Sequence, residues 1–372
     1  MITLNSLKST LSLKAHFYIL SNILSYYLLT FFGLVSLIIL LQFFRISDLI
    51  LVNGGDPYKI YLIIKYLLIL TLPILIPTTL LISLFLSYKS LREENELIAF
   101  ASVGLSDKQL LLPSFVMCAL MSLFCYICSA KLAPEAHIKS SIIENQIKSN
   151  FLKTGIRPKI YYDQGNFVLY SEDKINNEFI NIFIKDKKEN STTFAKKGRF
   201  VSEKDNNWFL NLELIDGKSF TKRKENLGNI VQFEEYKIPI PLNSRYNEVD
   251  LFHLNQTNKQ IFQALKNNKE LTQKKLNYYY IEILKRFNLS LIPLVFWIIF
   301  ITFGFSIHNR TAKSSLFAIG ILIGISYWIT YFMFEAVAFA SQNKSIILLP
   351  FVIYTSICLL ILFLKNKKQI LN

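Results

Sequence analysis

Few side chains in this 372-residue sequence have the types and spacing of a catalytic or metal-binding site. The four histidines stand far apart along the chain and offer no metal-ligand spacing. Cys125 and Cys128 have the spacing of a redox pair, but they stand in an uncharged apolar run where a thiolate is disfavoured. We therefore expect no metal, no cofactor and no disulfide framework, and we interpret the cysteines as small core residues.

Two further signatures of enzymes fail in detail. Gly217-Lys218-Ser219 is similar to the end of a phosphate-binding loop, but the glycine that this loop requires five residues earlier is Leu212. The sequence also shows no nucleophile elbow, no paired catalytic carboxylates and no His-Glu-x-x-His motif. We expect a protein without catalytic residues that binds no nucleotide itself.

One short acidic segment, residues 91–107, is a better candidate for function. Leu97, Ala101 and Leu105 have helical spacing, and an acidic cluster that includes Glu94 and Glu96 stands near the start, where acids suit the helix dipole. The cluster disfavours a helix that lies on anionic headgroups. The pattern favours a short helix that docks into a basic groove of a cytoplasmic partner.

The composition indicates which elements hold this segment in place. Hydrophobic residues make up 52% of the chain and charged residues only 18%, which is too apolar for an ordinary soluble domain. A bilayer core requires roughly 20 apolar residues per helix. Six stretches reach that length, at residues 17–44, 60–88, 110–130, 287–307, 314–334 and 345–364.

The basic residues predict the orientation of these spans. If the N-terminus is cytoplasmic, the inside loop ends carry ten lysines and arginines and the short outside loops carry three. We therefore expect both termini to be cytoplasmic. Residues 132–277 are then periplasmic, because large domains cross the membrane largely regardless of their charge.

The long insert differs from the rest of the chain. From about Arg157 it shows short alternating runs separated by turn residues, a pattern that predicts an antiparallel β domain of sandwich or jelly-roll type. Residues 135–153 and 255–276 are predicted to be helical connectors. The expected architecture is membrane α-helical: spans 1–3 in residues 1–131, an inserted β-jelly-roll domain in residues 132–277 and spans 4–6 in residues 278–372.

The net charge of +15 first suggests a polyanionic partner. Residues 132–277 contribute a net +6 and the membrane portion a net +9. The larger share stands at loop ends, where the positive-inside rule explains most of it. We therefore expect no nucleic-acid partner.

Short motifs along the chain match one family in order. Glu94-Asn-Glu96-Leu97 followed by Gly104-Leu-Ser106 resembles the coupling segment of the lipopolysaccharide-export permeases, the LptF/LptG (YjgP/YjgQ) family. The family often has a basic residue three positions before the coupling glycine, where this chain has Ala101, so contacts with a partner are expected to differ there. The other matching motifs, which extend the resemblance over nearly the whole chain, are Leu132-Ala-Pro134, Phe194-Ala-Lys-Lys-Gly198, Leu212-x-Leu-x-x-Gly217, Phe233-x-x-Tyr236 and Glu282-x-x-Lys285-Arg286-x-x-x-Ser290-x-x-Pro293.

The resemblance implies one half of a heteromeric ATP-binding-cassette transporter that extracts lipopolysaccharide from the bacterial inner membrane. It implies three kinds of partner: a cytoplasmic ATPase dimer, a second paralogous permease, and periplasmic bridge proteins that receive the lipid from the jelly rolls. By position, it implies that Glu96 contacts the ATPase with help from Glu94, and that Leu97 and Gly104 fix the coupling helix.

Three charges beside apolar segments are further candidates, because a charge at membrane depth is costly unless it is paired or faces water. Arg45 ends the first span, Lys65 lies in the second and Glu335 ends the fifth, all toward the expected outside. Arg45 and Lys65 are candidates for binding the lipid's phosphates, with Glu335 as the gate residue that pairs with one of them when no lipid is bound. The alternative is snorkelling to the interface, which suits the long stem of Lys65.

Two alternatives stay open. The chain could instead be a membrane-anchored periplasmic scaffold or envelope assembly factor without transport activity, for which an acidic coupling helix has no purpose. Gly320 and Gly324 form a small-x-x-x-small pattern in the fifth span that fits either a partner helix or packing within the chain.

Overall fold

The structure is a computed structural model that describes residues 2–53, 56–163, 167–175, 178–188, 190–201, 209–221, 229–241, 256–267, 272–305 and 314–371. The chain divides into two compact units. The helical unit consists of Met1–Leu40, Leu68–Ala136 and His253–Asn372, and the sheet unit consists of Leu41–Leu67 and His137–Phe252. The long polar insert therefore forms most of a unit of its own.

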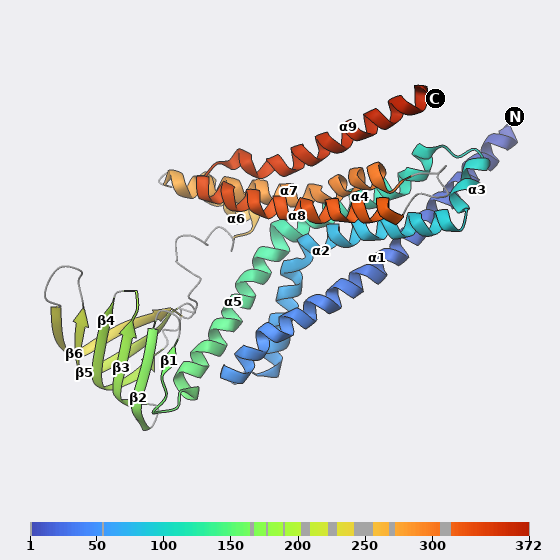
Figure 1. The fold of residues 1–372 in the computed structure, drawn as a ribbon. Helices are drawn as coiled ribbons and strands as arrows, with labels where there is room; N and C mark the ends of the chain where they lie inside the picture. The colour runs from blue at the N-terminus through green and yellow to red at the C-terminus, as the bar shows by residue number, and fades with distance from the viewer. Residues whose placement is uncertain are drawn as a thin grey trace. The chain divides into compact units, whose positions relative to one another are not determined.

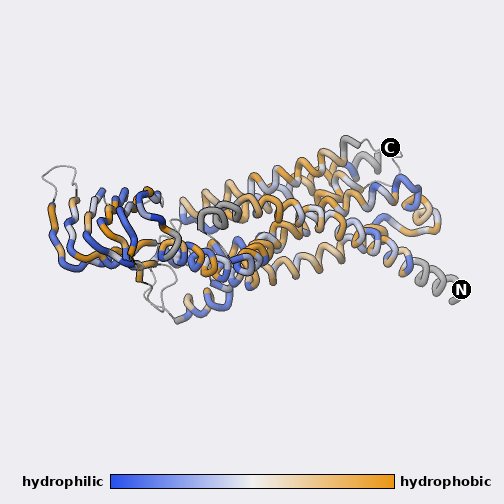
Figure 2. Tube along the Cα trace, turned by 90° about the horizontal axis from the view of Figure 1, so that it is seen from below, coloured by the Kyte–Doolittle hydropathy of each residue, from blue (hydrophilic) through white to orange (hydrophobic). Residues whose placement is uncertain are grey.

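Within the described ranges, six helical segments are long and apolar enough to cross a membrane, as the sequence predicts. Figure 2 shows the hydrophobic colouring that dominates these helices. The segments are Ser12–Phe44, Pro57–Glu93, Asp107–Lys153, Gln273–Phe303, Phe317–Ser341 and Lys344–Lys365. The α-helices, labelled in Figure 1, are α1 (Ile2–Asn53), α2 (Pro57–Glu93), α3 (Glu96–Ser102), α4 (Asp107–Ile127), α5 (Ala133–Asn150), α6 (Asn258–Asn267), α7 (Gln273–Phe303), α8 (Ser314–Ser341) and α9 (Leu349–Leu371).

The third span is longer than its apolar run. A π-helical turn, Cys128–Leu132, joins α4 to α5, so the helix continues well past residue 130, where the uninterrupted apolar run ends. The polar sequence of α5 meets the expectation of a helical connector at residues 135–153. A second π-helical turn, Phe151–Gly155, ends it.

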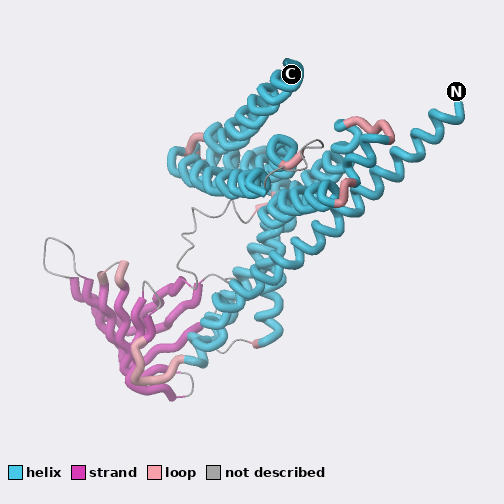
Figure 3. Tube along the Cα trace, turned by 45° about the vertical axis from the view of Figure 1, so that its right-hand side comes forward, coloured by secondary structure: helices cyan, strands magenta, loops and turns pink. Residues whose placement is uncertain are grey.

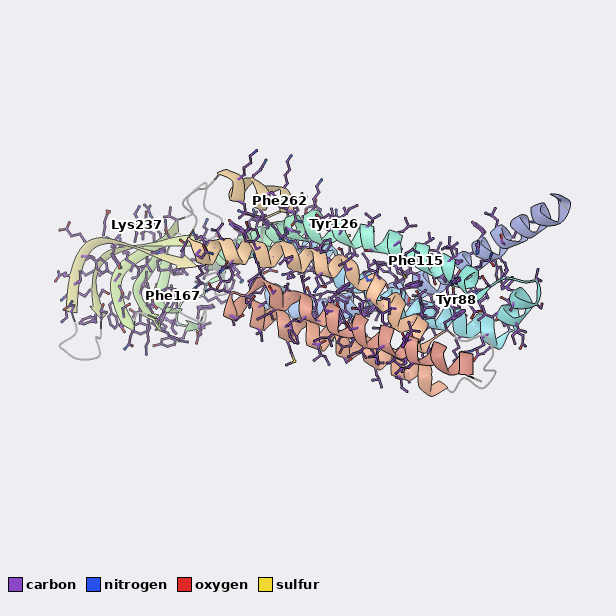
Figure 4. The ribbon with its side chains drawn as sticks, turned by 90° about the horizontal axis from the view of Figure 1, so that it is seen from above. Tyr88, Phe115, Tyr126, Phe167, Lys237 and Phe262 are labelled. Atoms are coloured by element: carbon purple, nitrogen blue, oxygen red, sulfur yellow. The ribbon has the colours of Figure 1, made fainter. Side chains whose placement is uncertain are left out.

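The core of the helical unit draws most of its buried side chains from α1, α2 and α7. Phe296 and Phe300 of α7 are fully buried, and the ring of Phe300 lies 4.8 Å from that of Tyr88 on α2. Tyr88, labelled in Figure 4, donates a hydrogen bond of 2.7 Å to the backbone oxygen of Leu110. The buried hydroxyl is thereby satisfied, as a low-dielectric interior requires.

The two glycines of α8 pack within the chain. A Cβ atom on Gly320 would lie 2.2 Å from the ring of Phe85 on α2, and one on Gly324 would lie 2.3 Å from Leu81 on the same helix. These side chains therefore occupy the space that a larger residue on α8 would need. The small-x-x-x-small pattern serves contact between the second and fifth spans of this chain.

The middle of the chain forms a six-stranded antiparallel sheet, shown in magenta in Figure 3. The strands lie in chain order, each paired with the next, so the described topology is a meander. The inserted antiparallel β domain is confirmed, but the described strands form one sheet and not the two facing sheets of a jelly roll. The strands are β1 (Tyr162–Asp163), β2 (Phe167–Ile175), β3 (Glu178–Asp186), β4 (Ser191–Val201), β5 (Phe209–Thr221) and β6 (Asn229–Pro241).

One face of this sheet has a core without a second described sheet. Leu169, Ile182 and Leu212 are buried on it. Phe151 and Leu152, from the π-helical turn after α5, belong to the same buried cluster. The end of the connector thus takes the place that a facing sheet has in a sandwich.

Candidate functional site

The 91–107 segment folds as a turn, a short helix and a second turn. α2 ends at Glu93, and Asn95 adopts a left-handed backbone conformation (φ 62°) that reverses the chain into α3. Gly104 (φ 90°) makes the second reversal before α4, a conformation that favours glycine. The helix predicted here is therefore shorter than the segment: of its acids, only Glu96 stands in the first turn of α3.

One side of α3 anchors it to the spans. Leu97 is buried and belongs to the main core of the helical unit, together with Leu91 and Leu105 on either side of α3. The backbone nitrogen of Ser106 donates to the side chain of Gln109 at 2.9 Å, which starts α4. The placement of Leu97 and Gly104 agrees with a structural role for both residues.

Glu96 is directed toward the first span. Its Oε1 accepts a hydrogen bond of 2.7 Å from the hydroxyl of Tyr18 on α1. Its Oε2 is enclosed and has no hydrogen-bond partner within the described ranges. One helical turn after Glu96 on α3, the ring of Phe100 lies edge-on to that of Tyr18, with 6.2 Å between the ring centroids. Glu96 and Phe100 thus link α3 to α1.

Glu94, by contrast, lies in the exposed turn before α3. Its Oε1 accepts a hydrogen bond of 3.1 Å from Ser90, one turn back on α2. Exposed apolar side chains follow it, namely Ile98 and Val103. The exposed side chains of this segment therefore include a carboxylate and two apolar groups, which could serve the rim and the core of a protein interface.

The three charges predicted to touch lipid are divided between the two units of the chain. Lys65 lies on α2 in the sheet unit and is exposed. The backbone of Arg45 lies in α1, but its side chain is outside the described residues. Glu335 lies near the end of α8, and its Oε1 is 3.2 Å from Nζ of Lys285 on α7. Pairing of Glu335 with Arg45 or Lys65 stays a prediction.

Lys285 belongs to a buried ion network in the first part of α7. Its Nζ lies 3.0 Å from Oε2 of Glu282, and Nε of Arg286 lies 2.8 Å from Oε1 of the same carboxylate. A guanidinium nitrogen of Arg286 also donates to Asn258 Oδ1 and to the backbone oxygen of Gln256, both at 2.8 Å. The network therefore joins α6, α7 and α8.

This network is the site that sequence reasoning missed. The spacing of Glu282, Lys285 and Arg286 places all three on one face of a helix, which was the available signal. The partner Glu335 lies 50 residues away along the chain, and no local pattern connects it with Lys285.

A family comparison matches almost the whole chain. The family described as "Lipopolysaccharide export system permease LptF/LptG" matches residues 17–365. This range includes the 91–107 segment, the sheet and the ion network.

A curated relative is similar over a shorter region. The uncharacterized protein RP871 of Rickettsia prowazekii (strain Madrid E) is 25% identical over 165 residues, which is 44% of this chain and 46% of the relative. The matched region thus spans about half the length of that relative. The family match, which covers most of the sequence together with its six long apolar helices and inserted sheet, shows that the chain belongs to the lipopolysaccharide export system permease family LptF/LptG.

Proposed function

We propose that this chain is a permease subunit of an ATP-driven transporter that extracts lipopolysaccharide from the inner membrane and passes it to a periplasmic bridge. Membership of a family of lipopolysaccharide export permeases supports this directly. The single structural observation that carries it is the 91–107 segment, whose buried side chains are fixed to the spans while Glu94, Ile98 and Val103 are exposed. A membrane anchor for a scaffold does not need such a surface.

In this proposal the chain has three parts with fixed orientation. Residues 1–131 carry spans one to three, residues 278–372 carry spans four to six, and residues 132–277 form the periplasmic domain between them. Both termini are cytoplasmic, so the 91–107 segment faces the cytoplasm. The ATPase is a separate dimer, and a paralogous permease completes the membrane portion.

The lipid path and the bridge are proposed from charge and topology. Arg45 and Lys65 bind the phosphates of the lipid, and Glu335 is part of the gate. β6 stands at one end of the strand order and has one described neighbour, β5. A free strand edge is a template for strand addition, so a periplasmic bridge protein of β structure pairs there.

The first test is purification of the tagged chain from native membranes, with mass spectrometry of the proteins it retains. We expect an ATP-binding-cassette ATPase and a second LptF/LptG-type permease. Glu94→Lys is expected to reduce recovery of the ATPase by roughly tenfold, because it places a cation against a basic groove. Glu234→Lys, which alters an exposed acid of β6, is the matched control and should retain the ATPase.

The outcome separates the two functions left open by the sequence. Retention of periplasmic proteins without any ATPase, by both the native chain and the control, would favour the scaffold. Equal recovery of the ATPase with Glu94→Lys would remove Glu94 from the docking surface while leaving the transporter in place.

A further inference from the structure

The ammonium group of Lys285 lies between two carboxylates that belong to different helices. Glu282, on the same helix, is 3.0 Å away, and Glu335, on α8, is 3.2 Å away. The Lys285 and Glu335 side chains are 15% and 22% exposed, whereas that of Glu282 is 3% exposed. The contact between helices is therefore the more accessible of the two.

The rest of the network stays intact without this contact. Arg286, 2% exposed, is paired with Glu282 and is held by two further hydrogen bonds to Gln256 and Asn258. If Glu335 moves away, Lys285 keeps Glu282 as a neighbour at 3.0 Å, although it then shares that carboxylate with Arg286. Breaking a buried pair is costly mainly when one partner remains uncompensated. The contact from α7 to α8 is thus a reversible one.

Charge balance defines what can replace Glu335. Lys285 and Arg286 balance Glu282 and Glu335, so the four side chains are neutral as a group. Without Glu335, the remaining three carry one net positive charge. A group with anionic oxygens restores neutrality in the position that the carboxylate leaves.

A second observation points to a ligand at the same place. Tyr331 stands one turn before Glu335 on the same face of α8 and is 1% exposed. Its hydroxyl has no hydrogen-bond partner in the described part of the chain. A buried hydroxyl without a partner costs free energy, and an acceptor oxygen supplied from outside would recover it.

We propose that Lys285 and Tyr331 form a binding site for a phosphate monoester, which the carboxylate of Glu335 occupies when the site is empty. The inference rests on the proposed function, because the phosphates of lipopolysaccharide are the expected ligand. An ammonium group and a hydroxyl both donate to phosphate oxygens, and such charge-assisted bonds are strong. Binding requires α8 to move from α7, so the ligand opens the contact that it replaces.

The test uses the purified complex in lipid nanodiscs and measures the Kd for bisphosphorylated lipid A and for lipid A without phosphates. Lys285→Gln is expected to raise the Kd for the phosphorylated lipid roughly tenfold, and Tyr331→Phe about threefold. Glu335→Gln removes the competing carboxylate and should lower that Kd severalfold. Lys274→Gln, at an exposed lysine nearer the start of α7, is the matched control.

Two further measurements distinguish a loss of binding from misfolding of the variant and identify the source of the phosphate. The double variant Lys285→Gln/Glu335→Gln keeps the network neutral and should still bind phosphorylated lipid A less well than the native complex. Inorganic phosphate at millimolar concentration is added as a competitor. Competition would assign the site to free phosphate as well, while its absence would assign it to the lipid headgroup.

The outcomes are distinct. A Kd that is the same for native, Lys285→Gln and double-variant complexes would overturn the inference and leave the proposed function standing. Equal changes with dephosphorylated lipid A would also overturn it, because they would show a structural ion pair only. Failure of the native complex to bind either lipid would overturn the proposed function and this site with it.

Discussion

The hydroxyl of Tyr18 on α1 donates a hydrogen bond of 2.7 Å to the carboxylate of Glu96, the first residue of α3. The two residues are 78 positions apart, and their contact joins the first span to the only short helix between spans two and three. Figure 1 shows α3 at the end of the helical unit where α1 begins. In the proposed transporter, this bond links the ATPase-facing segment to the lipid-facing span.

Tyr18→Phe is expected to uncouple these two parts. The substitution removes the hydroxyl but keeps the ring that contacts Phe100, so the 91–107 segment should fold and the complex should assemble. A hydrogen bond to a charged group contributes about 1.5–3 kcal/mol. Lipid-stimulated ATPase activity of the complex should fall severalfold while basal activity is retained.

The control for this prediction is Tyr26→Phe, two turns further along the same helix. It removes an equivalent hydroxyl that makes no contact with α3 in the described structure. Stimulation that falls equally in both variants would show a general effect on α1, and unchanged stimulation in Tyr18→Phe would remove the bond from the coupling path.

Gly320→Ala is expected to destabilise the helical unit. A methyl group at Gly320 would lie 2.2 Å from the buried ring of Phe85, so α8 must shift away from α2. Overpacking of this kind costs about 1–3 kcal/mol. The apparent melting temperature of the detergent-solubilised protein should fall by several degrees.

Gly33→Ala provides the matched control, because nothing lies within 4 Å of a Cβ atom at Gly33. Alanine is favoured over glycine in a helix by about 1 kcal/mol, so this variant should melt at the same temperature or higher. A normal melting temperature for Gly320→Ala would mean that α8 does not lie against α2 as described.

How far the sequence predicts the structure depends on the range of the interactions. Apolar length predicts all six spans, and alternation with turn residues predicts the antiparallel sheet, because both patterns are local. Turn chemistry at Asn95 and Gly104 was the local signal that α3 would be short. The sequence does not predict that the described strands form one sheet. The side chains that pack on the buried face of this sheet include Phe151 and Leu152, which come from the end of a helical connector.

The arrangement of the candidate site residues is likewise only partly predictable from the sequence. The acidic character of residues 91–107 was readable, but the sequence cannot distinguish Glu96, directed at Tyr18, from Glu94 in the exposed turn. The pairing of Lys285 with Glu335 also depends on how α7 packs against α8. Such contacts between distant segments are properties of the tertiary structure.

Acid is expected to weaken the sheet through Glu213. This residue of β5 lies between Arg199 of β4 and Lys237 of β6, with N–O distances of 3.0 and 2.9 Å. Figure 4 labels Lys237. Hydrogen bonds first from Lys237 and then from Arg199 lower the pKa of Glu213 below its usual value of 4.5. The stabilisation is therefore complete above about pH 4.5 and is lost as the pH falls through the lowered pKa.

Hydrogen exchange of the full-length protein, corrected for the intrinsic pH dependence, measures this effect. Glu213→Gln should reduce protection of the β5 amides at neutral pH and should differ little from the native protein well below pH 4. Glu234→Gln, at an exposed position of β6, should not change protection at either pH. A difference between Glu213→Gln and the native chain that persists in acid would show that the charge is not its cause.

Removing Arg286 is expected to be more damaging than removing Arg286 and Glu282 together. Arg286→Met leaves the buried network with one uncompensated negative charge, and breaking a buried pair in this way costs about 3–5 kcal/mol. The double variant Arg286→Met/Glu282→Leu leaves Lys285 paired with Glu335, so neutrality returns. Melting curves should therefore show a large loss for the single variant and partial recovery for the double variant. If the double variant is the less stable of the two, the hydrogen bonds from Arg286 to Gln256 and Asn258, and not charge compensation, hold α6 to α7.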